Sequence, residues 1–173
     1  MKKMVLFAIG PDRPGLVSDI SGVIHGAGGN LEDSRMATLS GDFALLVLFS
    51  APEEKLVAIE AGCRALQERL SITTHLKEAS APLTKEKGPV HAFTATGHDQ
   101  PGIVRRLTQV LAAHGANVVS MDTSLVHLAF HGTPMFKVKG RLSFAPDSDM
   151  RALRHQLEDV CEDMELLLEF EPY

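Results

Sequence analysis

The first half of the chain alternates between apolar runs of strand length and apolar residues at helical spacing. An apolar run over residues 4–9 stops before Gly10 and is typical of a buried strand. Apolar residues then recur at helical spacing over 16–24, and the pattern stops at Gly26, which favours a helix end there. The first half predicts, in order, a strand over 4–9, a helix over 16–26, strands over 30–39 and 43–49 joined by a tight turn, a helix over 53–70 and a strand over 71–77.

The second half repeats this order of elements. It predicts a strand over 90–96, a helix over 103–114, strands over 117–127 and 135–145, a helix over 148–162 and a strand over 165–171. Its hairpin is longer than the first by about seven residues, 128–134. The segment over 80–88 is rich in Lys, Glu, Pro and Ala, which predicts a linker between module 1 (1–79) and module 2 (89–173).

Each half therefore follows the order strand, helix, strand, strand, helix, strand. This βαββαβ order is that of the ferredoxin-like fold, in which a four-stranded antiparallel sheet carries both helices on one face. We expect an α+β protein of two tandem ferredoxin-like modules. Residues 43–49 are apolar at both alternating sets of positions, whereas a strand wetted on one face alternates. The face away from the helices is therefore expected to be covered, by the second module or by another chain.

A short motif recurs at the same place in the two halves. Asp12 begins an Asp-X-Pro-Gly sequence and is followed eighteen residues later by Asn30. Asp99 and Asn117 repeat this pattern at a constant offset of 87 residues. A fixed period with matching residues indicates that one supersecondary unit is used twice. Because Arg13 matches Gln100 and only the second half has the longer hairpin, the two loops are expected to differ in ligand or in role.

The motif lies in the predicted loop between a strand and a helix. Pro14 and Pro101 suit the first turn of a helix, where an N–H group has no partner to lose, and the glycine that follows keeps the backbone accessible. Free N–H groups at a helix start attract a small carboxylate, with a gain of about 0.3–1 kcal/mol. Carboxylate and amide side chains beside them can hold an ammonium group. The motif therefore predicts a site for a free amino acid, formed by Asp12, Arg13, Pro14, Gly15 and Asn30 in the first copy and by Asp99, Gln100, Pro101, Gly102 and Asn117 in the second.

Each motif residue also has an ordinary structural role. An Asp before a helix is often its N-cap, Pro-Gly commonly marks a helix start, and an Asn after glycine often adopts a left-handed turn conformation. The coincidence of all these residues at one spacing in both halves is what favours a binding site.

The strand, the Asp-Arg-Pro-Gly loop, the amphipathic helix and the Gly-Gly-Asn after it resemble the start of an ACT domain, a small-molecule sensing module. The resemblance covers nearly the whole chain as two tandem copies, and it points to the glycine cleavage system transcriptional repressor family. In that family the second copy has a longer hairpin that ends in Gly-Thr-Pro-Met-Phe, and residues 132–136 match this sequence in full.

The resemblance implies a regulatory protein that binds an amino acid, with glycine or serine as the expected ligand. ACT domains pair side by side or face to face and bind amino acids where modules meet, so it also implies a homo-oligomer or a tight pairing of the two modules. The implied protein partner is a transcriptional activator of glycine cleavage genes, repressed through protein contact. Many amino-acid-binding relatives have a polar residue such as His two positions before the loop Asp, where this chain has Gly10 and Gly97. The family's contacting positions correspond to Asp12, Asn30, Asp99 and Asn117.

The charge balance argues against direct binding to nucleic acid. The chain has 17 Lys and Arg against 22 Asp and Glu, and its formal net charge is −5. It has no transmembrane stretch, and its first apolar run is too short for a signal peptide. Cys63 and Cys161 lie in helical patterns that the repeat does not relate, so we expect two reduced, packed thiols. These features favour a cytoplasmic protein that binds neither nucleic acid nor membrane.

No arrangement of catalytic residues stands out in the sequence. No two His residues lie at i, i+3 or i, i+4 of one predicted helix, and the chain has no nucleophile elbow, phosphate-binding loop or dinucleotide-binding glycine motif. We therefore expect no catalytic residue, no metal and no cofactor, and a protein that regulates by binding. The alternative is a pure protein-interaction module that has kept the fold and lost the ligand.

Overall fold

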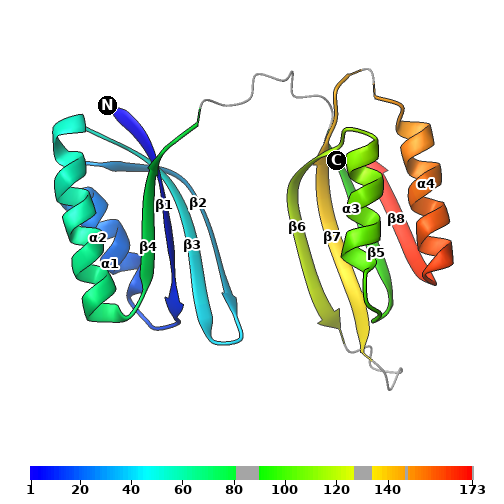
Figure 1. Ribbon diagram of the computed structural model, residues 1–173, viewed down its shortest axis with the longest axis horizontal. Coiled ribbons are helices and arrows are strands. Elements are labelled where there is room, and N and C mark those ends of the chain that lie inside the picture. Colours follow the sequence, from blue (N-terminus) through cyan, green and yellow to red (C-terminus); the bar gives the residue numbers. More distant parts are fainter. Residues whose placement is uncertain (81–89, 127–133, 147, 173) are drawn as a thin grey trace. The chain divides into compact units, whose positions relative to one another are not determined.

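The computed structural model describes residues 1–80, 90–126, 134–146 and 148–172 (Figure 1). The chain divides into two compact units, Met1–Pro82 (unit 1) and Leu83–Tyr173 (unit 2). The predicted linker over 80–88 and the predicted hairpin insertion over 128–134 lie outside the described residues, except for Ser80 and Pro134.

Unit 1 is a four-stranded antiparallel sheet with two helices. Its elements are β1 (Lys2–Pro11), α1 (Leu16–Gly26), β2 (Asn30–Leu39), β3 (Asp42–Ala51), the short 3-10 helix η1 (Glu53–Lys55), α2 (Leu56–Leu70) and β4 (Thr73–Glu78). The strands pair in the order β2-β3-β1-β4. Both helices cover the same face of the sheet (Figure 1).

Unit 2 repeats this architecture. Its elements are β5 (Val90–His98), α3 (Ile103–Ala113), β6 (Asn117–Val126), β7 (Met135–Ser143), α4 (Met150–Asp163) and β8 (Leu166–Pro172), and its strands pair in the order β6-β7-β5-β8. The expected α+β class of two tandem ferredoxin-like modules is confirmed. The predicted element ends differ from these by a few residues, most in β1, where pairing with β3 continues to both ends of the strand.

The core of each unit lies between its sheet and its helices. In unit 1, Leu6, Val47 and Phe49 of the sheet and Ile20 and Ile59 of the helices are at most 1% exposed. Each such side chain contributes about 1.5–3 kcal/mol by leaving water. The equivalent layer of unit 2 includes Leu107, Leu111, Leu142, Leu153 and Leu157.

One cross-strand pair is filled differently in the two cores. In unit 1, Leu6 on β1 lies opposite Val47 on β3. In unit 2 the matching pair is Phe93 on β5 and Gly140 on β7. A Cβ at residue 140 would lie 2.0 Å from Phe93 Cε1. The phenyl ring therefore occupies the space that a side chain at 140 would need.

The two cysteines are free and buried, which confirms the expected packed thiols. Burial raises the pKa of the Cys161 thiol to about 11, because the thiolate is disfavoured away from water. Burial also raises the pKa of Cys63, and the charge of Glu60 adds to that effect.

The outer sheet face, opposite the helices, is apolar in unit 1 and polar in unit 2. In unit 1, Phe7, Ile9 and Leu46 are 43%, 54% and 38% exposed on this face. The strand registers match six positions of the two units: Val5 with Ala92, Phe7 with Thr94, Ile9 with Thr96, Ala44 with Lys137, Leu46 with Lys139 and Leu48 with Arg141. The expected double-sided apolar strand is thus a property of unit 1.

Candidate functional site

The two motif loops have the same backbone conformation. Gly15 precedes α1 with φ 91° and ψ −8°, and Gly102 precedes α3 with φ 93° and ψ 0°. A positive φ of this size favours glycine. The helices start immediately after these glycines, so Pro14 and Pro101 lie before the N-cap and outside the first helical turn where the sequence analysis put them. Because the glycine is left-handed and therefore not helical, each helix begins at the residue after it.

No side chain caps the N-terminus of α1 or α3. The interpretation of Asp12 and Asp99 as N-caps is therefore wrong. Asp12 is tied to the turn between β2 and β3 instead. Its backbone N–H donates to the Gly41 carbonyl at 2.8 Å, and Thr38 Oγ1 donates to Asp12 Oδ2 at 3.5 Å. The first N–H groups of α1 and α3 therefore have no capping side chain to compete with a ligand anion.

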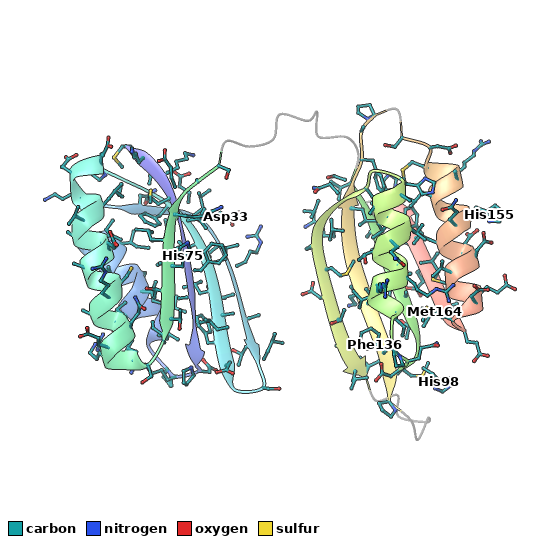
Figure 2. All side chains as sticks on the ribbon, viewed as in Figure 1. Asp33, His75, His98, Phe136, His155 and Met164 are labelled. Atoms are coloured by element: carbon teal, nitrogen blue, oxygen red, sulfur yellow. The ribbon has the colours of Figure 1, made fainter. Side chains whose placement is uncertain are left out.

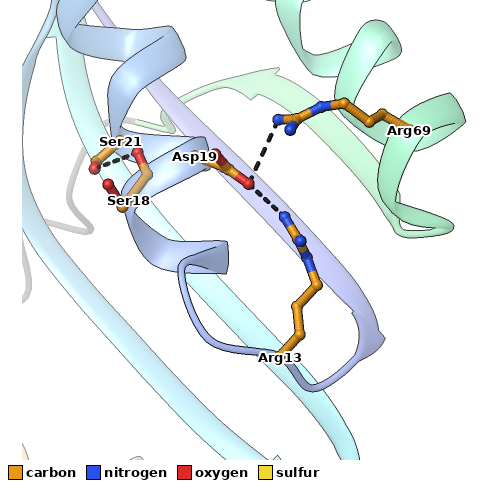
Figure 3. Close-up of polar contacts among 5 residues, drawn as sticks. All are labelled: Arg13, Ser18, Asp19, Ser21 and Arg69. Atoms are coloured by element: carbon orange, nitrogen blue, oxygen red, sulfur yellow. Dashed lines mark hydrogen bonds and ion pairs between the residues drawn. The ribbon is translucent and has the colours of Figure 1, made fainter.

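Arg13 is held by an ion pair inside unit 1. The Asp19 carboxylate, in the first turn of α1, accepts from the Arg13 guanidinium and also lies 3.4 Å from Arg69 Nη2 of α2 (Figure 3). One carboxylate thus joins the loop to both helices. Arg13 and Arg69 carry two positive charges, and Asp19 carries one negative charge. The net positive charge beside the helix start suits an anionic group of a ligand.

Gln100, which matches Arg13 in sequence, anchors its loop by another contact. Its Nε2 donates to the backbone carbonyl of Met164 at 2.6 Å, just after α4 ends (Figure 2). A carbonyl at a helix end has no partner within the helix, so this amide also caps α4. The loop of unit 2 is therefore fastened without a charge.

The ion pair between the two helices is present in both units with its charges exchanged. Asp19 of α1 and Arg69 of α2 occupy the positions taken in unit 2 by Arg106 of α3 and Asp163 of α4. Arg106 Nη2 lies 2.9 Å from Asp163 Oδ2. Both units thus have an ion pair at these positions, although the acidic and basic residues are exchanged.

Asp12 and Asn30 do not come together within unit 1. Asp12 follows the end of β1 that pairs with Asp42, whereas Asn30 pairs with Ser50. These two partners are eight residues apart on β3, which corresponds to about 26 Å along the strand. A molecule the size of an amino acid cannot touch both residues of one unit. Unit 2 has the equivalent register, so its Asp and Asn are separated in the same way.

Asn30 lies in a polar hollow of about 360 Å³ beside α1. Sequence reasoning missed three of its lining residues, Ser18, Ser21 and His25. Their spacing puts them on one exposed face of α1, and this was the signal available in the sequence. Ser21 Oγ donates to the Ser18 carbonyl at 3.1 Å (Figure 3).

Asn117 and Asp99 are both exposed in unit 2. Asn117 Nδ2 donates to Ser143 Oγ on β7 at 3.3 Å. His98, the last residue of β5, is exposed next to Asp99 (Figure 2). The positions that line the Asn30 hollow are occupied here by larger or apolar residues, Arg105, Thr108 and Ala112.

The described residues contain no cluster of three or more His, Cys, Asp or Glu that could hold a metal ion. Within the same residues, no helix is long and apolar enough to cross a membrane.

Near Asn30, Lys3 Nζ donates to Glu32 at 2.6 Å, and this contact keeps the pKa of the Glu32 carboxyl below its usual value.

A family model described as the ACT domain matches residues 2–77 and 93–171. The chain belongs to the ACT domain family. Units 1 and 2 are thus its two ACT modules.

Two curated relatives of this chain are named as transcriptional repressors. The glycine cleavage system transcriptional repressor of Escherichia coli (strain K12) is 28% identical over 121 residues, which cover 68% of this chain and 62% of the relative. The protein of the same name from Shigella flexneri gives the same values. The match therefore spans less than two thirds of the length of these curated relatives.

Two solved structures share the fold over nearly the whole chain. A crystal structure of an unknown protein from Galdieria sulphuraria has a TM-score of 0.84 at 29% identity and covers 99% of this chain and 98% of that one. A structure assigned as a glycine cleavage system transcriptional repressor has a TM-score of 0.71 at 20% identity with the same coverage, which shows the common fold alone.

Proposed function

We propose that this chain is a non-catalytic, cytoplasmic regulatory protein that senses a small amino acid, glycine or serine, through its motif loops. By similarity to its relatives, it regulates transcription of glycine cleavage genes by contact with a protein, an activator of those genes. It needs no metal or cofactor for this role, and it does not bind nucleic acid or membrane directly.

The matching conformation of the glycine before each helix, Gly15 and Gly102, supports this proposal most directly. Each loop presents the uncapped start of a helix, with Gly15 or Gly102 in the left-handed conformation and an Asp close by. Backbone N–H groups at a helix start bind carboxylates, and a nearby carboxylate binds an ammonium group. Two such loops at matching positions support a shared role as half-sites for a zwitterion.

The separation of Asp12 from Asn30 gives the site a further requirement. Because these residues lie at opposite ends of one sheet, a ligand that contacts both kinds of residue has to be held by two ACT modules. We infer that a second copy of the chain supplies the other module. Ligand binding then stabilises the oligomer, since the ligand binds only the assembled form.

Glycine would bind this site weakly. A ligand of about five heavy atoms gains at most about 1.5 kcal/mol per atom, or about 7.5 kcal/mol, which corresponds to a micromolar dissociation constant at best. Such an affinity suits the sensing of an abundant metabolite.

A calorimetric titration of the full chain with glycine and with serine tests this function. The variants Asp12→Ala, Asn30→Ala, Asp99→Ala and Asn117→Ala are expected to weaken binding about tenfold or more, because each removes a charged or amide contact. Asp122→Ala, an exposed change on β6 outside the motif, is the matched control. Absence of heat and of any thermal shift with every common amino acid would overturn the sensing role. Sedimentation with and without glycine tests the second copy.

One observation favours a second candidate function, a pure protein-interaction module. The outer face of unit 1 exposes large apolar side chains, including Phe7 and Ile9, and such patches often mark contact surfaces. Under this alternative the motif residues only shape the loops. Unchanged partner regulation in the four variants above would favour it over the sensing function.

A further inference from the structure

The outer sheet face of unit 1 is more apolar than its fold requires. Unit 2 has the same topology and register, yet it carries Thr94, Lys139 and Arg141 where unit 1 carries Phe7, Leu46 and Leu48. The ferredoxin-like fold therefore tolerates polar residues at these positions. The apolar residues of unit 1 call for a contact outside the core of that module.

The apolar residues form the floor of a hollow of about 380 Å³. Val5, Phe7, Leu46 and Leu48 come from the two central strands, β1 and β3. Since water occupies about 30 Å³ per molecule in the liquid, the hollow has room for roughly a dozen heavy atoms. Its volume lies within the range of about 300–1,000 Å³ that is usual for small-molecule sites.

The rim of the hollow carries a net positive charge. Lys77 of β4 lines it and makes no ion pair or hydrogen bond with any residue that the structure describes. On β2, Asp33 accepts from Arg35 Nη1 at 2.5 Å and from the Ser34 N–H at 2.8 Å, so its charge is already engaged. Figure 2 shows Asp33 and His75 on the side of the sheet away from the helices.

The size of the patch argues for a small occupant. The six matched positions lie on two neighbouring strands and cover about 10 Å by 17 Å. A stable protein interface buries about 800 Å² on each partner, so a protein bound here would also have to cover the largely polar edge strands β2 and β4. A small molecule needs only the hollow and one complementary charge.

We propose that the outer face of unit 1 binds a small amphipathic monocarboxylate, with its apolar body on Phe7, Leu46 and Leu48 and its carboxylate beside Lys77. The engaged carboxylate of Asp33 offers little to an ammonium group, so the expected ligand is an apolar acid rather than a zwitterion. This site lies on the opposite face of the sheet from α1 and α2 and is independent of the proposed amino-acid sensing.

Sodium octanoate, which has ten heavy atoms, is the probe for this site. In an amide NMR titration of the full chain, octanoate is expected to shift the signals of Phe7, Leu46 and Leu48, with a dissociation constant of about 0.1–1 mM. Octan-1-ol has the same apolar body without the charge and is expected to bind at least fivefold more weakly. Equal binding of the two probes, shifts confined to unit 2, or no shift up to 10 mM octanoate, a limit set about tenfold above the weakest expected constant, would overturn the proposal.

Two variants and a matched control locate the site. Phe7→Thr installs the residue of unit 2 and is expected to weaken octanoate binding about tenfold, and Lys77→Met is expected to weaken it at least threefold by removing the charge. Lys139→Gln, at the position of unit 2 that matches Leu46, is expected to leave binding unchanged. Glycine binding is expected to survive Phe7→Thr, so failure of one proposal leaves the other standing. One outcome would assign the face to a second copy of the chain and overturn this proposal. In that outcome the protein is a dimer, the dimer does not bind octanoate, and Phe7→Thr dissociates it.

Discussion

The two ACT modules of this chain have one topology and two very different outer faces. Phe7, Leu46 and Leu48 in unit 1 stand where unit 2 has Thr94, Lys139 and Arg141. The positions facing the helices are apolar in both units, because the core depends on them. Comparison of the modules thus separates what the fold requires from what each module does on its own.

The two motif loops are held in place by different side-chain contacts. Arg13 is bound by Asp19, whereas Gln100 is bound by the Met164 carbonyl, and both contacts fasten the motif loop to a helix of its own unit. The glycines before the two helices, Gly15 and Gly102, nevertheless have the same conformation. Different side chains can therefore meet one structural requirement, and only the residues shared by both loops are candidates for a shared ligand.

The largest effect is expected at the core pair that differs between the modules. Gly140→Val forces a side chain into the space of Phe93 and is expected to destabilise unit 2 by about 3 kcal/mol. The added change Phe93→Leu recreates the Leu–Val pair of unit 1 and is expected to recover most of that loss. Urea unfolding followed by amide NMR measures each unit separately. Additive effects in the double variant would show that the two residues do not share one space.

The two loop glycines are expected to respond equally. Gly15→Ala and Gly102→Ala each place a side chain on a left-handed residue and are expected to cost about 1–2 kcal/mol in the free energy of unfolding of their own unit. No atom lies within 4 Å of the added Cβ in either case, so the effect is purely conformational. Gly22→Ala, inside α1 and equally open, is the control and is expected to stabilise unit 1. Clearly unequal losses would contradict the equivalence of the loops.

A smaller effect is expected from the exchanged ion pair. Asp19→Ala removes two arginine contacts and is expected to cost unit 1 about 1 kcal/mol, whereas Arg106→Ala removes one contact and is expected to cost unit 2 about 0.5 kcal/mol. Thermal unfolding at low and high salt measures both. The double variant Asp19→Arg with Arg69→Asp exchanges the two charges, as in unit 2. It is expected to reach the stability of the unchanged unit 1 only when Arg13→Gln is added, because Arg13 would otherwise face the new arginine at position 19. Full restoration without that third change would contradict the assigned contacts.

At neutral pH the smallest effect is expected at the buried thiols. The pKa of Cys161 rises from an ordinary 9.0 to about 11, so the folded state keeps a proton that the unfolded chain loses. The stability of unit 2 is therefore expected to be unaffected by this group below pH 9 and to fall as the pH rises from about 9 to about 11. Alkylation of native protein at pH 8 is expected to be slow at both cysteines. Modification as fast as that of an unfolded chain would contradict their burial.

The fold could be predicted from periodicity, because the strand runs, the helical spacing and the repeated motif all agreed. The polar outer face of unit 2 was also readable, since Lys137, Lys139 and Arg141 alternate with apolar residues. The helix starts at residues 16 and 103 were predicted correctly. The placement of Pro14 and Pro101 in the first helical turn was wrong, because the positive φ of the glycine that follows each proline is a backbone property that no residue pattern states. Asp12 and Asn30 looked close in the motif, but a full-length strand pairing separates them.

The most direct test of amino-acid sensing is an amide NMR titration of the full chain with glycine. Saturable shifts are expected at Gly15 and Gly102 and at Asn30 and Asn117, with little change at outer-face residues such as Leu46 and Lys139. The shifts of the loop and of the Asn are expected to follow one binding curve, since one ligand contacts the loop of one module and the Asn of a second module. Absence of any shift at the four motif positions up to 10 mM glycine, well above the micromolar limit, would contradict the sensing of glycine through the motif loops.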